Sequence, residues 1–290
     1  NLILYLNIKL LHYYIMNIIQ KKGLKRNTLD KFYTSDTSVK ECIKRIKKHI
    51  TITKDDICIE PSAGNGAFIN PIKTLCDNYK FYDIEPEHDE IQQQDFLELD
   101  MSQYKLYTKI HCIGNPPFGR QSSFAIKFIK HCATFCDTIS FILPKSFKKN
   151  SLQKHVPLEF HLIHEYDIPK ESFLVNGKTH DVPCVFQIWE KKETKRKKPT
   201  KLFPTHFEFV KKNKIHDISF RRVGVNAGAI DTQTENKSFQ SHYFIKFKDV
   251  EVNEELLEKI KNIHYDSCDH TVGPKSISKQ ELIKEFNKII

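Results

Sequence analysis

Four consecutive residues, Asn115, Pro116, Pro117 and Phe118, have the side chains and backbone best suited to chemistry in this sequence. They directly follow an apolar run, residues 110–113, which predicts a buried strand. Because proline lacks a backbone N–H and has a fixed φ, two adjacent prolines must end this strand in one stiff conformation. Such a turn offers rigid hydrogen-bond acceptors, an amide oxygen and a carbonyl, next to an aromatic ring. An ordinary strand-ending turn is the alternative interpretation.

A second candidate site is the glycine-rich turn that follows the predicted strand at 56–60. Glycine permits a tight turn and lets a ligand approach the backbone closely. The sequence lacks the Gly-Lys-Ser/Thr ending of a phosphate-binding loop, and Ile69 stands where a dinucleotide-binding turn has its third glycine. The turn therefore suits a cofactor without phosphates. Its candidate residues are Glu60, Pro61, Ala63, Gly64 and Gly66.

Two acidic residues follow at the ends of later predicted strands. Asp83 ends the next apolar run, at a separation from the turn that suits hydrogen bonds to ribose hydroxyls. Asp95 follows a short third strand and precedes the aromatic Phe96. Singly, Asp83 could cap a helix and Phe96 could belong to the core. Their order after the glycine-rich turn makes chance a poor explanation.

The elements that would position these residues alternate between helix and strand from residue 31 to 190. This order is expected for an α/β protein with a parallel sheet that is covered by helices on both faces. Helices are predicted at 36–49, 68–76 and 124–136, strands at 56–60, 81–84, 109–113 and 138–144, and two closing strands at 160–169 and 182–190.

A charged block, KKETKRKKPTK, opens the stretch 191–204, which we interpret as a linker. A solvated basic face and a nuclear localisation signal are the alternatives for this block. Beyond it, residues 205–290 are predicted to form a second, smaller domain.

The apolar N-terminal run lies within residues 1–27, which are predicted to be an extension. Asn7, Lys9 and His12 interrupt this run, which argues against both a membrane span and a signal peptide. We expect residues 1–15 to be an upstream translation artefact or a flexible extension.

The composition limits the classes of partner and compartment. A net charge of +10 favours a polyanionic partner such as nucleic acid, although an AT-rich genome also enriches lysine, asparagine and isoleucine. The 8 cysteines include no C-x-x-C pair and predict reduced thiols in an intracellular protein that is not secreted. His264, Cys268 and His270 lack a fourth ligand at zinc spacing, so no metal site is predicted.

The order of these motifs resembles that of the gamma-class adenine-N6 DNA methyltransferases, which use S-adenosylmethionine. The matching stretches are KFYTS (31–35), EPSAGNGAF (60–68), YDIEP (82–86), QQDFL (93–97) and NPPF (115–118). The resemblance covers a predicted catalytic domain at 28–190 and implies the Rossmann-like sheet of class I methyltransferases. It implies that Thr34 and the turn from Glu60 to Gly66 surround the methionine part of the cofactor. It also implies that Asp83 holds the ribose and that Asp95 with Phe96 frames the adenine.

This resemblance gives the NPPF turn a chemical role. The exocyclic amine of adenine is a weak nucleophile because its lone pair is delocalised into the ring. The Asn115 side-chain oxygen and the Pro116 carbonyl, held rigid by Pro117, can accept both N–H bonds and stabilise the positive charge that develops on nitrogen. Phe118 would stack on a base rotated out of its duplex. No general base is needed, since the methylated amine is acidic enough to lose its proton afterwards.

The C-terminal tail looks like the small α+β domain of viral and phage members of this group, through RRVGVNAG, SHYFIK and TVGPKSISKQEL. This likeness implies a substrate-recognition domain and a location in the cytoplasm, the nucleus or a viral factory. For the arginines, pairing with a surface carboxylate is the alternative to contact with bases. The candidate nucleic-acid-binding residues are Arg221, Arg222, Lys275 and Ser276.

The expected activity is methylation of adenine N6, with double-stranded DNA as the partner and with neither a membrane nor a metal involved. Adenine in RNA, cytosine N4 and the glutamine amide of a release factor are compatible with the same turn. The basic tail argues against the protein substrate. A catalytically silent nucleic-acid-binding module is a further alternative, although such a protein has no chemical reason to keep Asn115.

Overall fold

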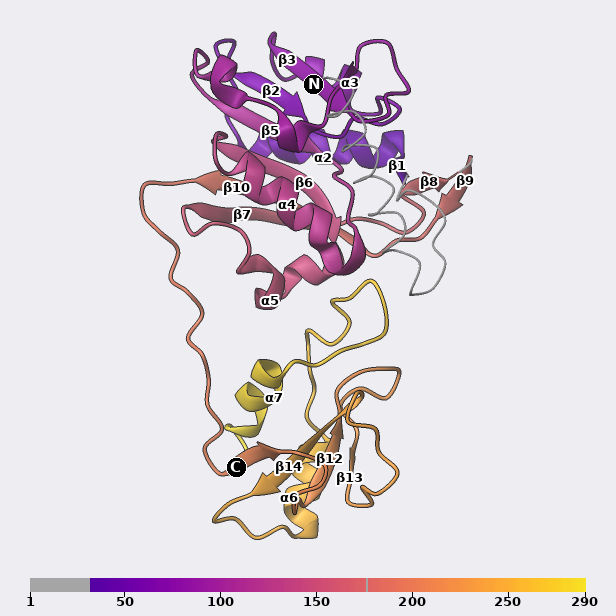
Figure 1. Cartoon of the computed structure of the whole chain (residues 1–290), viewed down its shortest axis with the longest axis vertical. Helices are drawn as coiled ribbons and strands as arrows, with labels where there is room; N and C mark the ends of the chain where they lie inside the picture. Colours follow the sequence, from indigo (N-terminus) through magenta and orange to yellow (C-terminus); the bar gives the residue numbers. More distant parts are fainter. Residues whose placement is uncertain (1–31, 176) are drawn as a thin grey trace, which may run out of the picture. The chain divides into compact units, whose positions relative to one another are not determined.

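A computed structural model describes residues 32–175 and 177–290, so the predictions for residues 1–27 lie outside the described residues. The main feature is a seven-stranded sheet in the order β4-β3-β2-β5-β6-β10-β7 (Figure 1). Its strands are β2 (Ile57–Glu60), β3 (Tyr79–Asp83), β4 (Gln92–Gln93), β5 (Ile110–Gly114), β6 (Thr138–Pro144), β7 (Phe160–Asp167) and β10 (Cys184–Lys191).

The sheet is mixed, where the sequence pattern predicted a parallel one. Neighbouring strands are parallel from β4 to β6, whereas β10 is antiparallel to both β6 and β7. The described residues between β7 and β10 contain no helix. Parallel neighbours are usually joined by a crossover helix, and here the chain returns without one, as an antiparallel strand.

The connection between β7 and β10 contains a hairpin that the sequence analysis did not predict. Strands β8 (Phe173–Val175) and β9 (Lys178–His180) pair antiparallel, and β1 (Tyr33–Thr34) pairs with the other edge of β8. The Asn-Gly pair at 176–177 is the usual sequence signal for a two-residue hairpin turn. This small sheet fixes the segment around residue 34 against a part of the chain far away in sequence.

The longest helix, α2 (Asp36–His49), spans the residues predicted for it, and the Ser35 side chain caps its N-terminus. Helices α3 (Ile69–Lys73) and α4 (Ser123–Cys132) are shorter at their C-terminal ends than predicted. No helix within 32–175 or 177–290 is long and apolar enough to cross a membrane. The short helical turns are η1 (Phe96–Glu98), η2 (Met101–Tyr104), η3 (Arg120–Ser122), η4 (Lys145–Lys148) and α5 (Asn150–Gln153).

Helices cover both faces of the sheet, as the sequence predicted. Alternate residues of β2 belong to different hydrophobic clusters: Ile57 and Ile59 pack in the cluster that contains α4, and Cys58 packs in the cluster that contains α2 and α3. In Figure 1, α4 and α2 accordingly lie on opposite faces. These layers and the strand order confirm the α/β, Rossmann-like fold class.

The C-terminal residues form a separate antiparallel sheet in the order β11-β14-β12-β13. Its sheet and helices share a hydrophobic cluster distinct from those of the large sheet. This confirms an α+β arrangement for the tail. The elements are β11 (Phe207–Val210), β12 (Ile218–Arg221), β13 (Ile230–Asp231), β14 (His242–Phe247), α6 (Glu254–Lys261) and α7 (Lys279–Phe286).

Part of the basic block after β10 packs on the large sheet instead of extending into solvent. The Arg196 guanidinium donates to the backbone carbonyls of Phe160 and Val156 and lies 5.0 Å from the centre of the Trp189 ring. The block is predicted to be a linker, with a solvated basic face as one alternative, but arginine can bury its planar group when carbonyls accept its hydrogen bonds. The proposed division at 191–204 stays a prediction.

Candidate active site

The order of the strands predicts where a ligand binds on the large sheet, beyond the carboxyl ends of β2 and β5. From β2 the chain proceeds to β3 and β4 on one side, and then returns to β5 on the other side. In open α/β sheets, ligands bind beyond the carboxyl ends of the two strands at such a reversal. The turns after β2 and β5 are the glycine-rich turn and the NPPF turn. They are in contact, because Ser62 Oγ donates to the Asn115 carbonyl at 3.3 Å.

The Asn115 side chain is held in one orientation. Its Nδ2 donates to the Phe32 carbonyl and to Thr34 Oγ1, both at 3.2 Å. Because the carbonyl can only accept, the amide NH₂ must face it and Oδ1 must face the other way. That oxygen is buried and has no hydrogen-bond partner among the described residues. The turn therefore carries an oriented acceptor without a donor.

Thr34, which the family resemblance implied to lie near the cofactor, accepts from the NH₂ group of the Asn115 amide. It is 6% exposed and pairs with Phe173 of β8. The unpredicted hairpin therefore positions the group that orients Asn115. The KFYTS stretch was recognised in the sequence, but no local pattern shows that it pairs with β8.

The other residues of the NPPF turn differ in exposure. Pro116 is buried, Pro117 is half-buried, and Phe118 is a half-buried ring that packs against the cluster of α2 and α3. The next residue, Gly119, has φ +67°, and a Cβ there would lie 2.5 Å from Cδ2 of Phe124. Phe124 is 39% exposed at the start of α4, and the sequence analysis missed it as a candidate ring beside this turn.

Three side chains lie next to the glycine-rich turn, and the sequence analysis missed Tyr33 and His88 among them. A Cβ on Gly64 would lie 3.4 Å from the Tyr33 ring, and a Cβ on Gly66 would lie 2.7 Å from Ile69 Cδ1 and 3.3 Å from the His88 ring. Both glycines have positive φ, so a side chain at either position would be strained, and at Gly66 it would also be crowded. The turn begins with Pro61 and Ala63, which are both buried.

Glu60 is a buried carboxyl group at the carboxyl end of β2. It is 2% exposed, and its Oε2 has no hydrogen-bond partner among the described residues. Burial, and to a smaller extent the charge of Asp83, raise the pKa of Glu60 well above its usual range. A positively charged ligand beside Glu60 would reverse this shift, so the carboxyl group suits a cation.

Asp83 ends β3 beside the glycine-rich turn and supports its backbone. Its Oδ2 accepts from the Gly64 N–H at 2.8 Å, and its Oδ1 accepts from the Glu85 N–H at 2.9 Å. A carboxylate has about four acceptor positions, so each oxygen can accept another bond from a ligand hydroxyl. Asp83 therefore combines a structural role with the capacity to hold a ribose.

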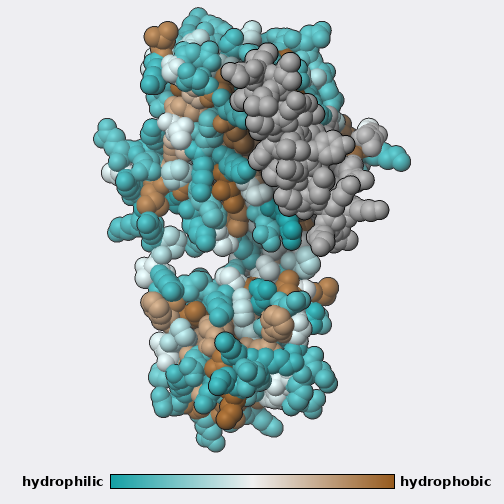
Figure 2. All heavy atoms as spheres, in the orientation of Figure 1, coloured by the Kyte–Doolittle hydropathy of each residue, from teal (hydrophilic) through white to brown (hydrophobic). Residues whose placement is uncertain are grey.

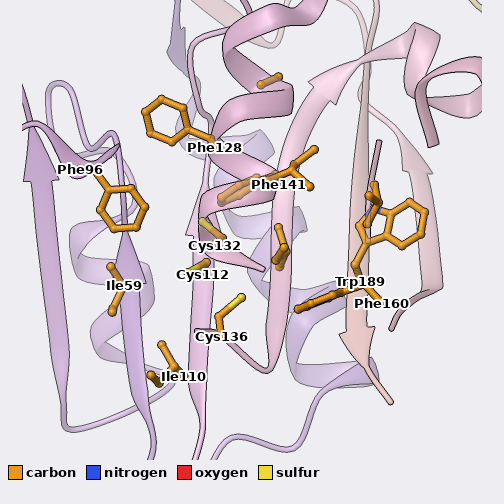
Figure 3. Packing of buried hydrophobic residues seen from close by; sticks show 14 of the residues in the cluster. Ile59, Phe96, Ile110, Cys112, Phe128, Cys132, Cys136, Phe141, Phe160 and Trp189 are labelled. Atoms are coloured by element: carbon orange, nitrogen blue, oxygen red, sulfur yellow. The ribbon is translucent and has the colours of Figure 1, made fainter. Parts of the chain in front are cut away.

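Asp95 and Phe96 occupy different environments in the structure. Asp95 is exposed, and its Oδ1 accepts from the Leu97 N–H at 3.0 Å. The Phe96 ring is 1% exposed and stacks on Phe128, with centroids 6.0 Å apart (Figure 3). The ring is part of the core, as the packing alternative suggested. A role of Asp95 with Phe96 at the adenine stays a prediction.

The candidate nucleic-acid-binding segments of the tail lie side by side. The Ile277 N–H donates to the Arg222 carbonyl at 2.8 Å, and the Gly224 N–H donates to the Lys275 carbonyl at 3.0 Å. Ser276 forms a β-bridge with Val223 in this pairing.

The two arginines and Lys275 have side-chain partners within the tail. Arg221 Nε donates to the Val223 carbonyl at 3.2 Å, and both Nε and an Nη of Arg222 donate to the Gln240 carbonyl. Lys275 pairs with Asp269 at 3.1 Å, which raises the pKa of the lysine. Among the residues that the structure describes, no three His, Cys, Asp or Glu side chains are grouped to hold a metal ion.

No protein-family model matches the sequence, and no curated protein does. Several solved structures are similar to it. PH1948 from Pyrococcus horikoshii, described as a candidate RNA methyltransferase, is 15% identical with a TM-score of 0.44, over 61% of this chain and 96% of that one. The 23S rRNA methyltransferase ErmE is 14% identical with a TM-score of 0.39, over 56% and 71%. A type I restriction-modification methyltransferase subunit from Streptococcus thermophilus is 14% identical with a TM-score of 0.42, over 57% and 46%. With identities and TM-scores this low, substrate and reaction have to be inferred from the residues of the site.

Proposed function

We propose that the chain transfers a methyl group from S-adenosylmethionine to the exocyclic amine of a nucleobase, and specifically to adenine N6. The observation that carries this proposal is the Asn115 side chain. Its amide NH₂ is occupied by Phe32 and Thr34, and its buried Oδ1 has no donor within residues 32–175 and 177–290. A buried acceptor without a partner costs about 1–3 kcal/mol, so an amine donor supplied by a substrate would stabilise it.

The residues at the carboxyl ends of β2 and β3 fit this cofactor. Glu60 has a buried, unpartnered oxygen suited to a cation, and S-adenosylmethionine carries a positive amino group and a sulfonium. Asp83 has acceptor positions left for the ribose hydroxyls. The glycines of the turn have positive φ, which allows the tight bend that follows β2. When bound, the cofactor supplies an electrophilic methyl group on a positively charged sulfur.

The chain's own contribution to the reaction is orientation and electrostatic stabilisation. Asn115 Oδ1 and the Pro116 carbonyl would accept the two N–H bonds of the amine, so its lone pair is localised on nitrogen. As nitrogen becomes positive, both acceptors bind the amine more strongly, and this difference lowers the barrier. Phe118, and Phe124 beside it, provide rings against which a base can stack. Proton loss from the product needs no titratable base.

The choice of adenine in DNA rests on the motif resemblance and on the net charge of +10. We propose double-stranded DNA with the target base rotated out of the duplex as the substrate. The same acceptors would serve RNA adenine or cytosine N4. Within the tail, Arg221, Arg222, Lys275 and Ser276 are proposed to hold the nucleic acid, in a recognition domain at 205–290.

The decisive experiment is to incubate the protein with S-adenosylmethionine labelled in the methyl group and with DNA and RNA of the same sequence, in single- and double-stranded forms. The products are then digested and the modified nucleoside is identified. We expect N6-methyladenine. Label in N4-methylcytosine would show that the target atom is cytosine N4 and not adenine N6. Cofactor binding without transfer to any of these substrates would favour a silent binding module and would overturn the proposal.

A further inference from the structure

The C-terminal sheet contains a pocket that the proposed reaction does not use. It has a volume of about 340 Å³ and lies over the ends of β11 and β14. Its lining includes four aromatic rings and three lysines, and no acidic side chain. In Figure 2 apolar side chains reach the surface of the C-terminal part between hydrophilic ones. The lining residues that matter below are Phe209, Phe239, Tyr243, Lys211, Lys212 and Lys279.

Two rings of this pocket contact each other and a lysine side chain of the same chain. Phe209 and Tyr243 are in edge-to-face contact, with centroids 5.4 Å apart. The Lys279 ammonium lies 4.3 Å from the centre of the Phe209 ring and 5.6 Å from that of Tyr243. The lysine is therefore held against the rings with its ammonium group at the pocket.

Phe239 stands at this pocket with 72% of its surface exposed. A phenylalanine this exposed buries little apolar surface within its own chain. Contact with a flat apolar partner would bury more of that surface and stabilise the complex. Its loop is nevertheless fixed, because Arg222 donates two hydrogen bonds to the carbonyl of the next residue, Gln240, at 3.1 and 2.9 Å. A ring presented on a fixed loop loses less conformational entropy on binding.

We propose that this pocket binds an unpaired nucleotide of the nucleic-acid substrate, with the base stacked on Phe239 and the neighbouring phosphates on Lys211, Lys212 and Lys279. Aromatic rings interleaved with lysines are the features that bind single-stranded nucleic acid. In a duplex the faces of the bases are stacked on one another, and only their edges are accessible in the grooves. A pocket with ring faces therefore selects single-stranded or locally opened nucleic acid. The inference rests on nucleic acid being the substrate, but not on methyl transfer.

Binding of the full chain to a fluorescently labelled oligonucleotide of about ten nucleotides, without the methyl donor, tests this inference. Phe239 should contribute to the affinity for the single strand but not to the affinity for the duplex of the same sequence. Phe239→Ala should lower the affinity for the single strand about tenfold, which is within the range measured for one base-stacking ring. The matched control is Phe203→Ala, which removes another ring that is 67% exposed and does not line the pocket. This variant should bind like the unmodified protein.

Phe239→Trp supplies a second measurement, because the one native tryptophan, Trp189, is buried and its emission should stay constant. The new indole should keep the affinity and lose fluorescence when the single strand stacks on it. Equal affinity of Phe239→Ala and the unmodified protein would overturn the inference. Equal quenching by the duplex, or displacement of the oligonucleotide by a polyglutamate peptide at equal charge, would also overturn it. If neither strand form bound at all, the nucleic-acid substrate itself would be wrong.

Discussion

Replacing Asn115 by alanine should separate methyl transfer from folding and cofactor binding. The substitution removes two hydrogen bonds, to the Phe32 carbonyl and to Thr34 Oγ1. Each is worth about 0.5–1.5 kcal/mol, so together they contribute about 1–3 kcal/mol to the free energy of unfolding. Part of this loss is offset, because the substitution also removes the buried, unpartnered Oδ1. We therefore expect a modest loss of stability and a protein that still folds.

The effect of Asn115→Ala on catalysis should be much larger. An acceptor that strengthens its bonds only as charge develops contributes to the transition state, and losing one such preorganised contact lowers turnover by roughly 100-fold or more. Turnover is measured as transfer of labelled methyl groups at saturating cofactor and nucleic acid. Cofactor affinity is measured by calorimetry and should stay close to that of the unmodified protein.

Asn78→Ala is the matched control for this prediction. Asn78 Nδ2 also donates two hydrogen bonds to backbone carbonyls, those of Lys54 and Asp56, at 2.8 and 3.0 Å. It precedes β3 and so lies at the amino end of that strand, away from the candidate site. The two variants should lose similar stability, but Asn78→Ala should keep its turnover. Near-normal turnover of Asn115→Ala, or an equal loss in both variants, would refute the role of Asn115.

Three further predictions concern the carboxyl ends of β2 and β3. The pKa of Glu60 is raised in the folded protein, so the stability linked to its proton is fully present below its unfolded value of about 4.5 and is lost as pH rises through the folded value. Glu60→Gln mimics the protonated group, so its free energy of unfolding in urea should equal that of the unmodified protein at about pH 4 and exceed it at about pH 8. A difference in stability that does not change with pH would contradict this. Asp83→Ala should weaken cofactor binding by about 1–3 kcal/mol, measured by calorimetry. It should also lower stability, because the Gly64 and Glu85 N–H groups donate to this carboxylate. Unchanged cofactor affinity would place the ribose elsewhere. Gly66→Ala should destabilise the fold by more than about 1 kcal/mol because of its φ of +84° and the 2.7 Å approach to Ile69, and equal thermal midpoints would show that the turn adapts.

Several features of the candidate site could be predicted from the sequence because their causes are local. The prolines after Asn115 end β5 whatever the rest of the chain does, and the run of apolar residues before them identifies a buried strand. The glycines after Glu60 likewise mark a turn with positive φ. The charge of the block after β10 was also visible, but the packing of Arg196 on Trp189 was not, because it depends on carbonyls contributed by other segments.

The structure was needed wherever a role depends on residues that are distant in the sequence. Asn115 is oriented by Thr34, which lies 81 residues away and is itself held by the β8 strand. The core position of Phe96 depends on its stacking against Phe128 of α4, so its residue type alone left both interpretations open.

The sequence by itself determined the alternation of helices and strands, the two turns at the carboxyl ends of β2 and β5, and the chemical character of their side chains. These properties follow from backbone restrictions and apolar periodicity within a few residues. Only the tertiary structure decided that the two turns meet, that Asn115 Oδ1 and Glu60 Oε2 are buried without partners, and that Phe209 and Lys279 line one pocket. The physical reason is that convergence and burial are set by strand order and packing, which join segments that no local pattern connects.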